Sequence, residues 1–140
     1  MSEDRFKDWE YPEFDERGFT KWNWMCQYPE NLELGKNTDI GAFTYINARF
    51  TVQIGEGVEV GSHCSIYSHS TIDDKKAKVV IERNVKIGTH SVIMPGVTIG
   101  ENTIVGAFSY VTESLPKNVI AFGIPAKIIR HLDDSENKGR

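Results

Sequence analysis

The chain has 140 residues, enough for one compact domain. Its formal net charge of −4 gives no general attraction to nucleic acid or to an anionic membrane, and no stretch approaches the roughly 20 apolar residues that cross a bilayer. The acidic N-terminus lacks the apolar core of a secretion signal, so we expect a cytoplasmic protein with Cys26 and Cys64 as free thiols.

Residues 1–33 precede a sequence repeat and share none of its periodicity. They contain FTKWNWMC, a segment dense in aromatic residues. The first coil of a solenoid would otherwise expose an open sheet edge, so we predict that residues 1–33 form an irregular N-terminal cap over it.

From residue 34 onward, a branched aliphatic residue or leucine returns about every six residues. These repeat heads are Leu34, Ile40, Ile46, Ile54, Val60, Ile66, Ile72, Ile81, Ile87, Ile93, Ile99, Val105 and Val111. Glycine often follows the head, and a small or β-branched residue often stands four positions after it. A period of six matches neither a helix nor a simple strand alternation, but it matches a short strand followed by a tight turn. Three such units would close one triangular coil, and the pattern predicts an all-β solenoid over residues 34–125.

The spacing lengthens at residues 46–54, 72–81 and 111–120, where we expect loops. The second of these contains the polar run DDKKAK. Solenoids often place insertions on their binding face, so the 73–80 loop is either a substrate flap or a solvated turn. After Pro125, residues 126–132 (AKIIRHL) predict a short amphipathic helix, and the charged tail DDSENKGR predicts disorder, so that 126–140 form a C-terminal helix and tail.

The motifs PGVTIG, VGAFSYV and GIPAK occur in the segment VIMPGVTIGENTIVGAFSYVTESLPKNVIAFGIPAKIIR. This segment is similar to the end of sugar O- and N-acetyltransferases, and residues 34–130 resemble the hexapeptide-repeat acyltransferases. The resemblance implies a left-handed parallel β-helix, a homotrimer with active sites between subunits, and acetyl-CoA as the acyl donor along the coil groove. No metal is implied.

The resemblance also implies positions for the donor. Backbone amides that would bind the pantetheine arm belong to Gly106, Ala107 and Ser109. Residues near the nucleotide end would be Gly123, Pro125, Ala126 and Lys127, with Lys127 facing a phosphate. This chain departs from the family at Phe108, where a glycine is common.

Acyl transfer from a thioester needs a base, and histidine titrates near neutrality. The chain has His63, His69, His90 and His131. Counting the heads in threes puts Ile46, Ile66, Ile87 and Val105 in one column. Their turn residues, Arg49, His69, His90 and Phe108, would then share one edge, with His63 on another. The family's catalytic position corresponds most nearly to His69, so we favour His69 as base, with His90 as the alternative. Asp73 or Asp74 would be able to orient His69.

These observations predict transfer of an acyl group to an amino or hydroxyl group of a sugar. We favour a nucleotide-linked amino sugar used in surface polysaccharide synthesis. Two other functions stay open: a non-enzymatic β-helix scaffold, and a carbonic-anhydrase-like metalloenzyme, which would need three converging histidines.

Overall fold

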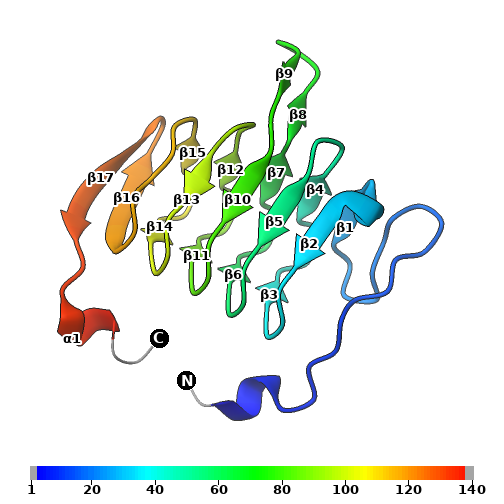
Figure 1. The fold of residues 1–140 in the computed structure, drawn as a ribbon, viewed down its shortest axis with the longest axis horizontal. Coiled ribbons are helices and arrows are strands. Elements are labelled where there is room, and N and C mark those ends of the chain that lie inside the picture. The colour runs from blue at the N-terminus through cyan, green and yellow to red at the C-terminus, as the bar shows by residue number, and fades with distance from the viewer. Residues whose placement is uncertain (1–2, 138–140) are drawn as a thin grey trace.

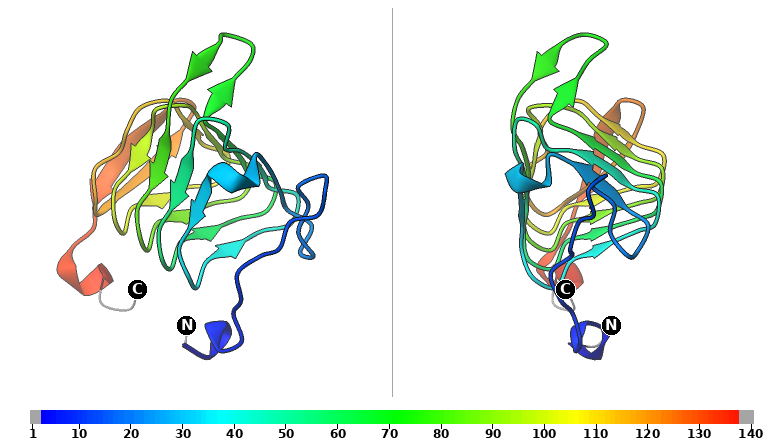
Figure 2. Two further views of the ribbon diagram at one scale, coloured as in Figure 1. Left: turned by 45° about the vertical axis from the view of Figure 1, so that its right-hand side comes forward. Right: turned by 90° about the vertical axis from the view of Figure 1, so that its right-hand side faces the viewer.

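The computed structural model describes residues 3–137, which form a parallel β-solenoid with three sheets (Figures 1 and 2). Sheet A contains β1 (Met25–Gln27), β4 (Tyr45–Asn47), β7 (Ser65–Tyr67), β12 (Val92–Ile93) and β15 (Tyr110–Val111). Sheet B contains β2 (Leu32–Leu34), β5 (Val52–Ile54), β10 (Val79–Ile81) and β13 (Thr98–Ile99). Sheet C contains β3 (Asp39–Ile40), β6 (Glu59–Val60), β11 (Lys86–Ile87), β14 (Ile104–Val105), β16 (Val119–Gly123) and β17 (Ala126–His131).

The remaining elements lie outside the three sheets. They are η1 (Glu3–Phe6), η2 (Pro29–Asn31), β8 (His69–Ser70), β9 (Lys75–Lys76) and α1 (Asp134–Asn137). Strands β8 and β9 form an antiparallel hairpin that stands out from the solenoid (Figure 1). None of the described helices is long and apolar enough to cross a membrane.

The chain visits sheets B, C and A in turn, and most repeat heads fill the space between them. The sheet A column is Cys26, Ile46, Ile66, Ile93 and Val111. The sheet C column is Ile40, Val60, Ile87, Val105 and Ala121. The sheet B column is Leu34, Ile54, Ile81 and Ile99, with Leu115 bridged to Ile99. Nearly all of these side chains are buried, and they form one continuous core.

Glycine after the head is required where successive turns lie close together. A Cβ on Gly88 would lie 2.5 Å from the backbone nitrogen of Ala107 in the next coil. Any side chain at this position would therefore force the coils apart.

The predicted column of Ile46, Ile66, Ile87 and Val105 is wrong after Ile66. Ile72, counted as a head, is 98% exposed on the β8–β9 hairpin. The hairpin therefore contributes no repeat unit, and every later head was assigned one sheet too far along. Ile93 pairs with Ile66 in sheet A, whereas Ile87 pairs with Val60 in sheet C.

The two ends also differ from the prediction. The solenoid begins inside the predicted cap, because β1 already pairs with β4. Trp24 is buried and packs edge-on against Phe14, covering the end of the first coil. The predicted helix over 126–132 is wrong: residues 126–131 form β17, which pairs antiparallel with β16 and satisfies that strand's backbone groups. In the tail, α1 occupies part of the segment predicted to be disordered, and residues 138–140 lie outside the described residues.

Candidate functional site

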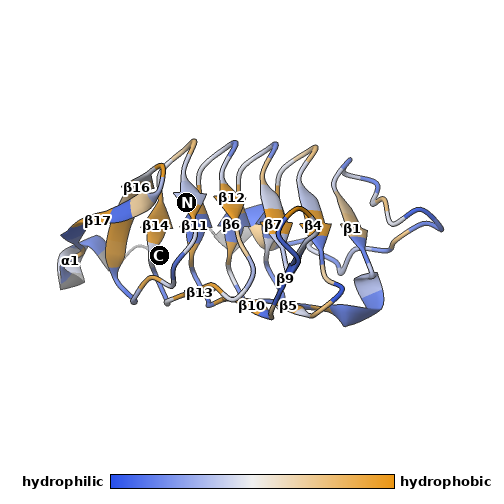
Figure 3. Cartoon of the chain, turned by 90° about the horizontal axis from the view of Figure 1, so that it is seen from above, coloured by the Kyte–Doolittle hydropathy of each residue, from blue (hydrophilic) through white to orange (hydrophobic). Residues whose placement is uncertain are grey.

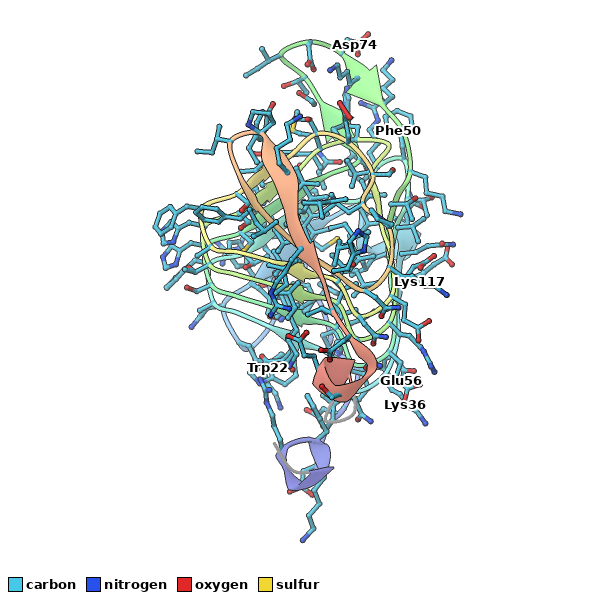
Figure 4. All side chains as sticks on the ribbon, turned by 90° about the vertical axis from the view of Figure 1, so that its left-hand side faces the viewer. Trp22, Lys36, Phe50, Glu56, Asp74 and Lys117 are labelled. Carbon is cyan, nitrogen blue, oxygen red and sulfur yellow. The ribbon has the colours of Figure 1, made fainter. Side chains whose placement is uncertain are left out.

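The turns between sheets form three edges of the prism, which we name by the sheets that they join. Figure 4 looks along the solenoid and labels Lys36, Glu56 and Lys117 near the BC edge, with Phe50 and Asp74 near the AB edge. The CA edge carries the turns from sheet C to sheet A, which form a row in Figure 3.

Four rings stack along the CA edge on successive coils, and we call them the ring column. Its members are Phe43, His63, His90 and Phe108. The centroids of His63 and His90 are 4.7 Å apart with the rings 3° from parallel, and those of His90 and Phe108 are 4.9 Å apart at 8°. Phe43 and His63 are 5.2 Å apart and tilted by 42°.

The ring column corrects the predicted placement of the histidines. His90 stacks on His63, which was assigned to another edge, and His69 lies elsewhere. A repeated motif in the sequence carries this signal: IGAFTYI (40–46), VGSHCSI (60–66), IGTHSVI (87–93) and VGAFSYV (105–111) place a ring at the same position after the head. Comparing these four heptapeptides, rather than counting heads, would have found the column.

His90 has the hydrogen bonding that a general base needs. Its Nδ1 lies 2.8 Å from Oγ1 of Thr89, and the Thr89 hydroxyl donates to the carbonyl oxygen of Ser62 at 2.8 Å. Because the single hydroxyl proton is donated to a carbonyl, Oγ1 accepts a hydrogen bond from Nδ1–H. We therefore assign the Nδ1–H tautomer, which leaves the lone pair on Nε2. The His90 side chain is exposed.

His69 lies at the base of the β8–β9 hairpin on the AB edge. It is only 8% exposed and meets Phe50 edge-on, with centroids 5.3 Å apart. Its Nε2 lies 3.5 Å from Oδ1 of Asp74, and Lys76 Nζ lies at the same distance from that oxygen. Of the two aspartates considered for orienting His69, the carboxylate beside the ring is that of Asp74. His131 lies in β17, away from these residues.

The two groups of residues expected to bind the donor lie side by side. Residues 106–109 form the CA-edge turn before β15, and residues 123–126 form the turn between β16 and β17. Buried Ser109 joins these turns, because its Oγ donates to the carbonyl oxygen of Gly106 at 2.7 Å and accepts from the amide of Gly123 at 3.1 Å. Lys127 is exposed in β17 and free to face an anion.

An open groove of about 500 Å³ runs over sheet C beside the CA edge. Its edge-side lining includes Gly61, Gly88, Gly106 and Ala107. Its floor carries Glu59, which accepts from Lys86 at 2.8 Å and from Arg5 at 2.7 Å. Partial burial would raise the pKa of Glu59, but these two cations outweigh it and hold the pKa below its ordinary value. A groove of this size suits a small molecule or part of one.

The histidines do not form a three-ligand metal site within one chain. His69 is on a different edge from His63 and His90, and the described residues contain no group of three histidine, cysteine or carboxylate side chains placed to hold a metal ion.

Residues 78–113 match the family model described as bacterial transferase hexapeptide (six repeats). The galactoside O-acetyltransferases of Lactococcus lactis and Escherichia coli are each 35% identical to the chain, over alignments of 119 and 118 residues. The two matches cover 74% and 78% of this chain. The chain spans only 58% of either relative. A hexapeptide-repeat acetyltransferase of Vibrio cholerae, solved with acetyl coenzyme A, superposes with a TM-score of 0.74 at 30% identity, covering 79% of this chain and 66% of that one. These matches confirm the predicted solenoid of hexapeptide repeats.

Proposed function

The chain belongs to the hexapeptide-repeat family of bacterial transferases, and from that premise we propose that it transfers an acyl group, acetyl in the simplest case, from coenzyme A to a sugar. The observation that carries the proposal is the His90–Thr89–Ser62 chain of hydrogen bonds, which presents the lone pair of an exposed imidazole beside the expected donor turn.

In the proposed reaction, His90 is the general base. Its Nε2 accepts a proton from the hydroxyl or amino group of the acceptor, whose oxygen or nitrogen then attacks the thioester carbonyl carbon. As the tetrahedral intermediate collapses, the carbon–sulfur bond breaks and the acyl group stays on the acceptor. The departing thiolate takes the proton from Nε2, which restores the neutral imidazole. The Thr89 hydroxyl keeps the ring in the required tautomer throughout.

The donor would lie along the CA edge. The backbone amide of Ala107 would donate to the pantetheine arm, because the amides of Gly106 and Ser109 already donate within the chain, to the carbonyl oxygen of Ala121 and to Oγ of Ser91. Lys127 would contact a phosphate at the nucleotide end. Support comes from the Ser109 hydrogen bonds, which hold the two turns together, and from the groove beside them. Gly123, Pro125 and Ala126 complete this end of the proposed site.

Geometry favours His90 over His69 as the base. His90 is exposed and its tautomer is fixed, whereas His69 is buried beside Phe50 and Asp74. A base in the position of His69 would have to be uncovered by movement of the hairpin before an acceptor reached it. We therefore reverse the order of the two candidates and keep both in the test.

The finer parts of the proposal concern the acceptor and the assembly. Relatives named galactoside O-acetyltransferases support a sugar acceptor. A nucleotide-linked amino sugar for surface polysaccharide remains our specific proposal, together with a homotrimer working in the cytoplasm. Light scattering on the purified protein would test the trimer directly.

The activity is tested by following free-thiol release from acetyl-CoA with a panel of galactosides, amino sugars and nucleotide-linked amino sugars. We expect acceptor-dependent release that His90→Ala abolishes and His69→Ala retains in large part. Mass analysis of the product shows whether oxygen or nitrogen is acylated. Lack of release with every acceptor, together with lack of acetyl-CoA binding in the same samples, would leave a structural β-helix.

A further inference from the structure

The ring column occupies turns whose backbone does not favour rings. At the BC edge the same left-handed turn is filled by Asn37, Gly57, Asn84, Asn102 and Asn118. In the ring column φ lies between 58° and 66°, a conformation that asparagine and glycine adopt readily and phenylalanine adopts at a cost. Phe43 and Phe108 are also 64% and 60% exposed, so burial does not offset that cost. Such departures from local preference concentrate at functional sites.

The geometry of the column indicates the shape of ligand that it fits. The ring of His90 lies within 3° of parallel to that of His63 at 4.7 Å, and within 8° of parallel to that of Phe108 at 4.9 Å. Since stacked rings themselves need about 4.5 Å between centroids, no planar ligand fits between these neighbours. The column therefore presents ring edges in a line along the solenoid. A flexible linear chain that runs along this line would contact several rings at once.

The length of the donor decides which part of it reaches which ring. The phosphate end is proposed to lie at Lys127 beside the β16–β17 turn, and the arm passes Ala107 next to Phe108. From phosphate to sulfur, the pantetheine arm has roughly 13 bonds, which span about 16 Å at about 1.2 Å per bond, or about three coils. Three coils from the β16–β17 turn lead past Phe108 and His90 to His63. The thioester would therefore lie close to His63, with its acyl group directed towards Phe43 on the next coil.

An acetyl group is too short to use this surface. It adds one carbon beyond the thioester carbonyl, whereas one further coil of about 4.8 Å takes about four more bonds at about 1.2 Å each. With acetyl-CoA bound, Phe43 would stay in water. With a chain of about six carbons, the methylene groups would cover the exposed edge of the Phe43 ring and gain the hydrophobic contribution that it now lacks.

We propose that Phe43 and His63 select the acyl group, and that the preferred donor carries a linear saturated chain of about four to six carbons. This inference rests on the proposed acyl transfer, and it holds whichever histidine is the base. It makes the first two rings of the column the part that distinguishes one acyl-CoA from another. Phe108 meets the pantetheine arm, which all acyl-CoA donors share.

Binding of the chain can be measured without turnover. S-alkyl derivatives of coenzyme A carry their chain on a thioether sulfur and cannot transfer it. We expect calorimetry to show that hexyl-CoA binds the wild type about tenfold more tightly than ethyl-CoA, because its additional methylene groups are buried. Phe43→Asn should reduce this ratio to below about threefold and leave the Kd of ethyl-CoA unchanged. Asparagine tolerates the positive φ, so this variant should unfold at the wild-type temperature or above.

Two further variants separate chain selection from other effects. Asn37→Phe puts the same ring in the same turn at the BC edge, away from the donor, and should keep the wild-type ratio. Phe108→Asn should change the Kd of hexyl-CoA and ethyl-CoA by the same factor. In thiol-release assays with one fixed acceptor, Phe43→Asn and His63→Asn should each lower kcat/KM for hexanoyl-CoA about tenfold and spare that for acetyl-CoA.

The possible results distinguish this inference from the proposed function. Equal binding of ethyl-CoA and hexyl-CoA by a wild type that releases thiol would overturn the inference and leave acyl transfer standing. So would a Phe43→Asn variant whose acceptor KM rises while its hexyl-CoA binding is unchanged, because the ring would then contact the acceptor. A wild type that neither binds coenzyme A nor releases thiol would overturn the proposed function itself, and this inference with it.

Discussion

Ile66 and Ile72 are six residues apart and fit the repeat spacing equally well, but the solenoid buries the first and exposes the second. Ile66 is fully buried in the sheet A column between Ile46 and Ile93, whereas Ile72 stands almost fully exposed on the hairpin. Ile66→Ala removes three carbon atoms from the core, a transfer loss of about 2.4 kcal/mol at about 0.8 kcal/mol each. The coils above and below cannot collapse into the space, so the cavity brings the total to about 3–4 kcal/mol.

Urea unfolding followed by circular dichroism measures the difference. With a slope of about 2 kcal/mol per molar urea, Ile66→Ala should lower the unfolding midpoint by about 1.5–2 M. Ile72→Ala is the matched control and should change the free energy of unfolding by less than about 0.5 kcal/mol. Equal losses in the two variants would refute the register, because Ile72 would then be a repeat head in the core.

Three further changes test the site and its surroundings. Thr89→Val removes the acceptor that fixes the His90 tautomer and should lower kcat about tenfold with little change in either KM, whereas unchanged kcat in steady-state assays would exclude this role. Gly88→Ala places a Cβ against the backbone of Ala107 and should cost about 1–3 kcal/mol in thermal or urea unfolding. Glu59→Gln should destabilise the protein at neutral pH. Because the folded-state pKa of Glu59 lies below its ordinary 4.5, the wild type should lose this advantage as pH falls through that lower value, and a difference that persists in acid would argue against the ion pairs.

The solenoid itself follows from local chemistry. Six-residue spacing of aliphatic heads, with glycine after them, reports a short strand and a tight turn in every coil. The assignment of the later heads to their sheets does not follow from spacing. Ile72 falls six residues after Ile66 and has the aliphatic side chain of a repeat head. Only its exposure in the folded chain distinguishes it from a head.

The C-terminus shows how tertiary context overrides a local pattern. Residues 126–132 have helical periodicity, but the preceding strand β16 would otherwise have an unpaired edge. Pairing β17 with that edge satisfies its backbone groups, even though Ile128 and Ile129 remain exposed. The spacing of residues in the sequence does not indicate whether this segment forms a helix or a strand paired with β16.

The candidate site was predictable in part. The donor turns were identified through motifs, and the structure brings them together through Ser109. The partner of His90 was missed, although Thr89 precedes it in the chain, because hydrogen bonding to Ser62 depends on the stacking of successive coils. The same stacking of coils brings the four rings of the ring column together. The four repeated heptapeptides predict this column, because each places a ring at the same position after the head.

The most direct test of the account is a structure of the protein with coenzyme A and a galactoside bound. We predict the thiol along the CA edge, with the acceptor's nucleophilic oxygen within about 3 Å of Nε2 of His90. A thiol bound instead at the AB edge, beside His69 and the hairpin, would contradict the assignment of the base.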